Sequence, residues 1–221
     1  MRSRDNILLV EGESDRLFFE AVRDRMDLRT AVQVTPPRDV GGDHNSKEGL
    51  LKHLPVLLNQ LYDGLLKRLA VVIDADFVAN SALGFVRTSE RLEKLLNEAG
   101  FTRANRAPQH RGQIFQHTDG LADLGVWIMP NNRDDGALED FLHDCVSPSE
   151  RALYERAQAT VHALPTPKFR STARVKAEMS TWLAWQPHPG RGVHQALRDG
   201  LFALDCPAYA GLAEWLRHIY R

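Results

Sequence analysis

The sequence predicts an α/β fold in which a mostly parallel β-sheet is flanked by helices. Short apolar runs typical of buried strands alternate with longer segments of helical periodicity through the first two thirds of the chain. Acidic residues directly follow several of these apolar runs. Since parallel strands end at a common edge of their sheet, this placement indicates a sheet that gathers its functional side chains at that edge.

Each predicted strand is a short apolar run bounded by turn residues. The runs are Ile7–Val10, Ala31–Val34, Leu69–Ile73, Gln113–His117 and Leu124–Met129. The last two flank an Asp-Gly pair that is typical of a β-hairpin turn. Strands that alternate with helices favour right-handed crossovers between parallel neighbours, so we expect a three-layer arrangement with a hairpin inserted.

Helical periodicity follows the strands. An apolar stripe predicts a helix with Ser14 as its N-cap. Leucines at helical spacing predict a second helix over 50–61, although Pro55 lies inside it. Two more helices are predicted at Ser89–Glu98, which a glycine ends, and at Ala137–Cys145.

The character of the chain changes after Ser147. The remainder is predicted to be helical, is interrupted by the proline-containing stretches LPTPKF and QPHPGRG, and carries three of the four tryptophans. We therefore predict an α/β domain over residues 1–147 and a helical C-terminal appendage over 148–221 that packs on it. A chain of 221 residues is long enough for one well-buried domain of this kind.

Composition narrows the function classes. A net charge of −1 and a pI of about 6.8 give no global positive field for nucleic acid, so such binding needs a local basic patch, a metal bridge or a partner subunit. The two cysteines have no metal-ligand spacing and are expected to be structural thiols rather than a disulfide. No apolar stretch approaches the ~18 residues of a membrane span, so we expect a cytoplasmic protein without a membrane partner.

The acidic residues at the strand ends predict a divalent-metal site. Asp74 and Asp76 lie two apart at the end of a predicted strand, so strand geometry would turn both side chains the same way. Glu11 ends the first strand, which in a doubly wound sheet commonly lies beside the third. Carboxylates crowded together repel each other, and oxygen ligands suit Mg²⁺ or Mn²⁺.

Three further acids could complete this site. Asp15 lies one helical turn beyond Glu11, and Glu139 and Asp140 open the helix after the last strand, where they could form a second metal position. The alternative for Asp15 and Asp140 is a purely local role, because an acid stabilises a helix N-terminus. Asp134 and Asp135 are predicted to be solvated loop residues.

The chain resembles a known family through three segments. LVEGESD, then VVIDAD and later GALEDFL, are similar to the Toprim domain of topoisomerases, bacterial primases and OLD-family nucleases. The resemblance covers about residues 6–145 and implies a Toprim/Rossmann-like fold in which Glu11, Asp74 and Asp76 are the acidic motif. The OLD-like branch also implies roles for Asp15 and Glu139. More narrowly, the chain resembles small stand-alone Toprim-like proteins.

The resemblance implies a nuclease that depends on Mg²⁺ or Mn²⁺. Lys176, or secondarily Lys168, would supply the cation that such a reaction needs near the phosphate. DNA is the expected substrate rather than RNA, an ATPase encoded elsewhere is the expected partner, in phage defence, and a homodimer is considered. Many Toprim sequences continue the DxD motif with Asp or Gly, whereas this chain continues with Phe77-Val78.

Two other readings remain open. The first is a non-catalytic metal- or nucleotide-binding module that acts in regulation or assembly. The second is a haloacid-dehalogenase-like phosphatase, in which Asp74 would be the nucleophile, Asp76 the acid/base and Asp134-Asp135 the later acidic pair. Basic residues that gather before the predicted hairpin either contact a phosphate backbone or are ordinary surface; they are Arg103, Arg106, His110 and Arg111.

Overall fold

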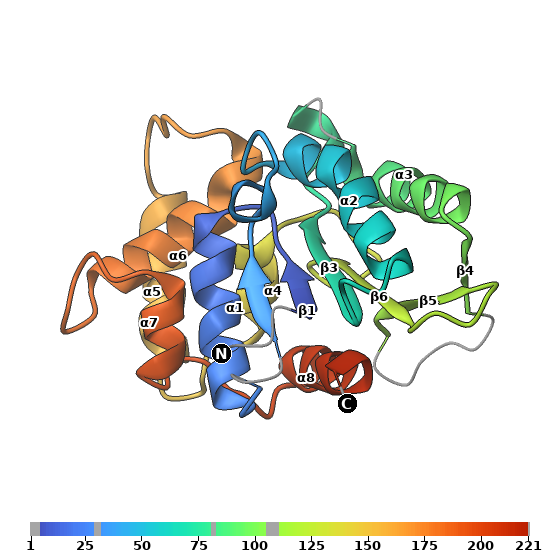
Figure 1. Cartoon of the computed structure of the whole chain (residues 1–221). Helices are drawn as coiled ribbons and strands as arrows, with labels where there is room; N and C mark the ends of the chain where they lie inside the picture. Colours follow the sequence, from blue (N-terminus) through green and yellow to red (C-terminus); the bar gives the residue numbers. More distant parts are fainter. Residues whose placement is uncertain (1–4, 29–31, 81–82, 105–110, 221) are drawn as a thin grey trace.

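The computed structural model describes residues 5–28, 32–80, 83–104 and 111–220. In this part of the chain a sheet of six strands has the order β2-β1-β3-β6-β5-β4 (Figure 1). Parallel pairing joins β2 (Gln33–Thr35), β1 (Asn6–Leu9), β3 (Arg68–Asp74) and β6 (Leu124–Met129). Antiparallel pairing adds β5 (Gln113–His117) and β4 (Phe101–Arg103) at one edge. The predicted α/β class, its mostly parallel sheet and its hairpin are therefore confirmed.

The helices cover both faces of the sheet (Figure 1). On one face lie α2 (Lys47–Tyr62) and α3 (Gly84–Glu98); on the other lie α1 (Glu13–Arg25), α4 (Leu138–Asp144) and α8 (Pro207–Tyr220). The remaining helices continue this second layer and are α5 (Arg151–His162), α6 (Arg174–Ala184) and α7 (Val193–Arg198). Short 3₁₀ turns occupy Pro37–Val40, Val78–Asn80 and Ser171–Ala173.

Alternation along β3 divides the core between the two faces. Val71 and Ile73 pack with the leucines of α2 and with α3, whereas Ala70 and Val72 pack with α1 and α8. All four side chains are buried, which is typical of a central parallel strand. The next residue in the second set is Asp74, so β3 itself directs that carboxylate toward the layer of α1 and α4.

The C-terminal helices share one buried cluster with α1 and the sheet. Trp182 and Trp215 are fully buried within it. The Tyr220 hydroxyl donates a hydrogen bond of 2.6 Å to the carbonyl of Ile7 in β1. The segment is helical and packs on the sheet. The division of the chain into two units, with a boundary at residue 148, stays a prediction.

Two local expectations were wrong. Helix α1 begins at Glu13 with Gly12 as its N-cap, not Ser14, because the Asp15 carboxylate reaches back to accept a hydrogen bond of 3.1 Å from the Gly12 N–H. The short strand β4 was not predicted, since three residues, of which only Phe101 is apolar and buried, carry too little pattern. The first residue of the predicted strand Ala31–Val34 lies outside the described residues.

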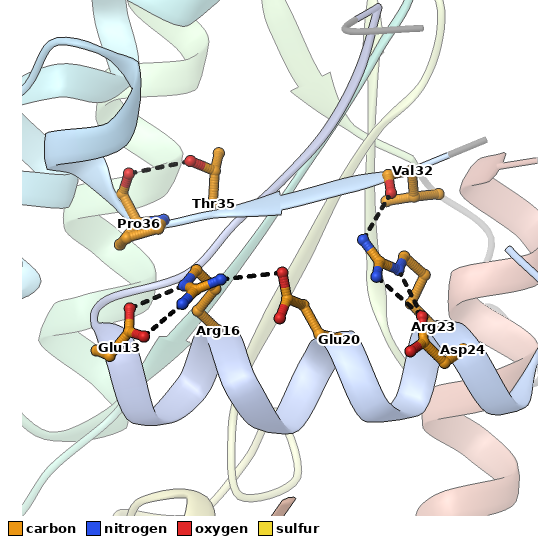
Figure 2. A network of polar contacts seen from close by, with 8 residues as sticks. All are labelled: Glu13, Arg16, Glu20, Arg23, Asp24, Val32, Thr35 and Pro36. Atoms are coloured by element: carbon orange, nitrogen blue, oxygen red, sulfur yellow. Dashed lines mark hydrogen bonds and ion pairs between the residues drawn. The ribbon is translucent and has the colours of Figure 1, made fainter. Parts of the chain in front are cut away.

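Charged side chains pair along α1, and one of them reaches the segment just before the edge strand β2 (Figure 2). Arg16 donates to Glu13 and, at 3.0 Å, to Glu20, forming a ladder along the helix. One turn further on, Arg23 donates a hydrogen bond of 3.4 Å to the carbonyl of Val32, just before β2. These contacts hold the helix whose first turn carries Asp15.

No helix in the described ranges is long and apolar enough to cross a membrane.

Candidate acidic site at the carboxyl edge of the sheet

Glu11 and Asp74 meet where β1 and β3 end. The two strands are parallel neighbours with Leu9 opposite Val71, so the residues just beyond them come together. The Glu11 carboxylate accepts a hydrogen bond of 2.8 Å from the backbone N–H of Asp74. The predicted adjacency of the first and third strands is thus present, and it brings together acids 63 positions apart in the sequence.

Asp74 lies at the electrostatic centre of the site. Burial raises its pKa well above the usual range, and the negative charges of neighbouring acids raise it further. These neighbours are Glu11, Asp15, Asp76 and Glu139. Acids from α1, from α4 and from just beyond the ends of β1 and β3 are therefore close enough to act on one carboxylate.

Glu11 and Asp15 share this environment. Burial raises the pKa of Glu11 to about 7, although the nearby Lys47 ammonium and the Asp74 N–H act in the opposite direction. Burial likewise raises the pKa of Asp15 to about 6, with the Gly12 N–H lowering it and the Glu139 charge raising it. Negative charge at this edge is thus only partly compensated by the protein, which favours uptake of a proton or a cation.

Asp76 departs from the strand geometry that was expected for it. It lies beyond the last residue of β3 and has a φ of 60°, so the alternation of a strand does not govern its side chain. Its carboxylate pairs with Lys47, the first residue of α2, and the same ammonium donates 3.0 Å to the Ala75 carbonyl. Asp76 therefore borders the site from the α2 side rather than standing in line with Asp74.

The backbone of Asp76 also anchors the loop that leads into α4. Its N–H donates 2.8 Å to the Gly136 carbonyl, and the Gly136 N–H donates 3.2 Å back to Asp76. This small antiparallel bridge holds the start of α4 against the end of β3. Glu139 reaches the acidic edge as a consequence.

Glu139 pairs with a lysine at the border of the site. Its carboxylate forms an ion pair of 3.1 Å with Lys176 on α6. Although burial lowers the pKa of Lys176, the charges of Glu139, Asp74 and Asp15 raise it overall. Lys176, the preferred of the two candidate lysines, therefore lies beside the acidic residues.

Asp140 has a local role in the helix. Its carboxylate accepts a hydrogen bond of 2.8 Å from the Ala137 N–H at the start of α4. Burial is the main cause that raises its pKa. This contact is the capping alternative considered for Asp140, and it matches the contact that Asp15 makes at the start of α1.

Other candidate residues point elsewhere. Asp134 pairs with Arg133 on the surface, and Asp135 accepts a hydrogen bond of 2.7 Å from the Phe85 N–H at the start of α3. Lys168 is exposed. Of the basic residues before the hairpin, Arg106 and His110 lie outside the described residues.

Lys47 is the site residue that sequence reasoning missed. It follows the Gly-Gly loop 41–46, which does not match a phosphate-binding loop because no glycine directly precedes the lysine. Ser46 caps α2 by accepting a hydrogen bond of 3.1 Å from Gly49 N–H, so Lys47 lies in the first turn of that helix. Only 12% of its side chain is exposed. The sequence signal that could have identified Lys47 is its position directly after a helix N-cap, in a helix that leads to the strand ending at Asp74.

Comparison with known proteins identifies the family. The family model described as "Protein of unknown function (DUF3226)" matches residues 5–221. The chain belongs to this family. No curated protein and no solved structure matches the chain. In this DUF3226 protein the Toprim resemblance is therefore a hypothesis that depends on the site itself.

The acids of this DUF3226 protein have the donor atoms that a divalent cation prefers, but their side chains are not yet positioned to bind one. Oxygen donors dominate the edge, as Mg²⁺ and Mn²⁺ require, and Glu11 and Asp74 keep partial contact with solvent. Across the described ranges, however, no three His, Cys, Asp or Glu side chains are arranged to hold a metal ion. Lys47 engages Asp76 and Lys176 engages Glu139, so side chains would have to rotate before they coordinate one.

Proposed function

We propose that this protein is a divalent-metal-dependent nuclease that hydrolyses phosphodiester bonds at a Toprim-like acidic site. The observation that carries the proposal is the meeting of Glu11 with Asp74 at adjacent strand ends, surrounded by the charges of Asp15, Asp76 and Glu139. Largely buried acids with raised pKa values at the carboxyl edge of an α/β sheet mark a candidate functional site.

The acids and the lysine would have distinct roles. When bound, Mg²⁺ or Mn²⁺ would polarise the phosphate and lower the pKa of an attacking water. Glu11, Asp74 and Asp76 are the proposed ligands, with Asp15 and Glu139 beside them. Asp140 is the weakest of the proposed ligands because it already caps α4. Lys176 would stabilise the negative charge that develops on the phosphate, since its ammonium already lies at the acidic edge.

Substrate engagement would depend on a second component. A net charge of −1 supplies no general attraction for a polyanion. By the resemblance to OLD-type nucleases, a partner ATPase would bring DNA to the site, in phage defence. Asp76, whose side chain is 44% exposed, marks the side from which a phosphate could approach.

A second candidate function is favoured by the lysine contacts. Because Lys47 already pairs with Asp76, and no three donors in the described part of the chain converge, the edge could instead serve a non-catalytic module that binds a metal or nucleotide for regulation. A phosphatase of haloacid-dehalogenase type is less well supported, because Asp134 and Asp135 make their contacts away from Asp74.

The deciding experiment measures cleavage of labelled DNA and RNA with Mg²⁺ or Mn²⁺, alone and with candidate ATPases. Asp74→Asn tests the site, and Asp63→Asn is the matched control because Asp63 caps the far end of α2 and is exposed. We expect metal-dependent cleavage that Asp74→Asn abolishes and Asp63→Asn retains. Metal binding that requires Asp74, without cleavage of any substrate, would favour the regulatory module instead.

A further inference from the structure

A pair of thiols joins the sheet domain to the C-terminal helices, away from the acidic contacts described above. Cys145 caps the C-terminus of α4, and Cys206 directly precedes α8. Both are free cysteines, 61 positions apart in the sequence, and their sulfur atoms lie 2.9 Å from each other. Two thiols in contact across such a separation are candidates for covalent linkage.

The backbone around the thiols imposes this contact. The Ala203 N–H donates 2.6 Å to the Cys145 carbonyl, and the Ser147 N–H donates 3.0 Å to the Leu201 carbonyl. Between them, Val146 and Phe202 form an antiparallel bridge. This pairing fixes the Cys145 backbone beside residues 201–203, and the Cys206 N–H donates 3.4 Å to the Ala203 carbonyl. The approach of the sulfurs therefore does not depend on side-chain rotation alone.

The two thiols differ in accessibility and in reactivity. Cys145 is buried, whereas Cys206 is partly exposed. The Cys206 sulfur accepts a hydrogen bond of 3.4 Å from the Tyr209 N–H in the first turn of α8, a position where the helix dipole favours a thiolate. The hydrogen bond with the Cys145 thiol and those from backbone N–H groups lower the pKa of Cys206 to about 7, while burial and the charge of Asp144 act in the opposite direction.

We propose that Cys206 and Cys145 form a redox-active dithiol, in which Cys206 is the attacking thiol toward small disulfides and Cys145 resolves the product. The ligand class is a low-molecular-weight disulfide such as glutathione disulfide. Accessibility, the helix N-terminus and the sulfur contact together assign the two roles. This inference is independent of the proposed nuclease activity.

The exchange balances in two steps. The Cys206 thiolate attacks one sulfur of the small disulfide, a new S–S bond forms, and one small thiolate leaves and takes up a proton. The Cys145 sulfur then attacks the Cys206 sulfur, the mixed S–S bond breaks, and the second small thiolate leaves with the proton from Cys145. The two cysteines are oxidised to a disulfide and the small disulfide is reduced to two thiols.

An open cavity lies next to the segments that carry the pair, although neither cysteine lines it. The cavity has a volume of about 750 Å³, and residues adjacent to both cysteines line it, namely Asp144, Pro207 and Ala208. Two bases, Arg111 and Arg133, and two acids, Asp144 and Glu214, line it. The wall thus offers charges of both signs, which suits a molecule that carries both ammonium and carboxylate groups, such as glutathione disulfide.

The resulting disulfide would close a loop that contains α5, α6 and α7. Lys176 lies within this loop, on α6. Oxidation would therefore tie the helix that carries Lys176 at both ends of its segment, and it should raise the thermal stability of the protein by restricting the unfolded chain.

The test treats the full, reduced chain with glutathione disulfide and follows intact mass without reductant. We expect the wild type to lose two hydrogens and both alkylatable thiols, Cys145→Ser to accumulate a glutathione adduct on residue 206, and Cys206→Ser to stay unmodified. A wild type that keeps both thiols free, or that stops at a stable adduct, would overturn the proposal. So would an adduct on Cys145 in the Cys206→Ser variant.

A measurement on the wild type alone guards against a variant that fails to fold. Under reducing conditions, brief iodoacetamide treatment followed by peptide mass analysis compares the alkylation rates of the two thiols. We expect Cys206 to react at least about tenfold faster than Cys145, given the difference in thiolate character and exposure. Equal rates, or faster reaction at Cys145, would remove the assigned roles.

Discussion

The carboxylate of Glu11 accepts a hydrogen bond of 2.8 Å from the backbone N–H of Asp74 and so joins the ends of β1 and β3. The contact serves the fold and the site together. It satisfies a backbone N–H beyond the regular ladder of the sheet, and it also keeps two acidic residues adjacent in a buried environment. Stability and chemistry at this edge are therefore linked through one side chain.

The first prediction concerns the dependence of stability on pH. The pKa of Glu11 rises from an ordinary value of 4.5 to about 7 in the folded protein, so the folded state binds more protons between these values. The free energy of unfolding should thus fall as pH rises from about 4.5 to 7 in metal-free buffer. Glu11→Gln should remove on the order of 1–3 kcal/mol of this fall.

Urea denaturation at a series of pH values with a chelator present measures the slope. Glu98→Gln is the matched control, because Glu98 is an exposed glutamate near the end of α3. It should leave the slope unchanged. If the slope of Glu11→Gln equalled that of the wild type, the carboxylate would not be protonated in the folded protein at pH 5–6.

A second prediction concerns the packing of α8 beneath the sheet. A Cβ atom on Gly125 of β6 would lie 2.7 Å from the Ile219 side chain and 2.8 Å from the Trp215 ring. Gly125→Val should therefore destabilise the protein by about 1–3 kcal/mol through overpacking. Thermal denaturation measures the loss, and Gln116→Val is the control for a valine at a strand position, since Gln116 lies on β5 and is exposed. Equal loss in both variants would mean that the contact with α8 is not responsible.

Local pattern was sufficient for much of the fold and for most of the site. The run Leu69–Ile73 is apolar on both faces, so it reads as a central strand, and the acids that follow it must then lie at the carboxyl edge. Because β1 pairs with β3 in parallel, Glu11 lies at the same edge of the sheet. These inferences need only strand geometry and a right-handed crossover.

The contacts that sequence could not supply are those made between distant elements. Lys47 reaches Asp76 because α2 begins beside the end of β3, and Asp76 turns toward it through a left-handed backbone conformation. Neither feature can be predicted from the local periodicity of apolar residues. The contact between Cys145 and Cys206 likewise depends on the pairing of Val146 with Phe202, which no sequence motif predicts.

A third prediction concerns Lys47 as the resident counter-charge of the site. In Lys47→Met the Asp76 carboxylate loses its partner, so the acidic edge should bind Mn²⁺ more tightly. The pair is partly exposed, and its loss should change the binding free energy by on the order of 1 kcal/mol, or roughly fivefold in Kd. Calorimetric titration measures Kd. Lys52→Met is the control, because Lys52 is exposed and pairs with Asp43 outside the site. Weaker binding by Lys47→Met would show that the lysine supports the site instead of competing for it.

The last prediction separates cation binding from chemistry at Lys176. Its ammonium pairs with Glu139 at 3.1 Å and feels the charges of Asp74 and Asp15, so it is held at the acidic edge without being a metal donor itself. Under the proposed function, Lys176→Met should lower kcat for DNA cleavage by about 10²-fold, as for loss of one charge-stabilising donor. Mn²⁺ affinity should not weaken, because the variant removes a positive charge. Lys176→Arg should recover part of kcat, and Lys168→Met, at an exposed position before α6, should leave it unchanged. If Lys176→Met weakened Mn²⁺ binding as much as it slowed cleavage, the lysine would be positioning Glu139 rather than acting on the phosphate.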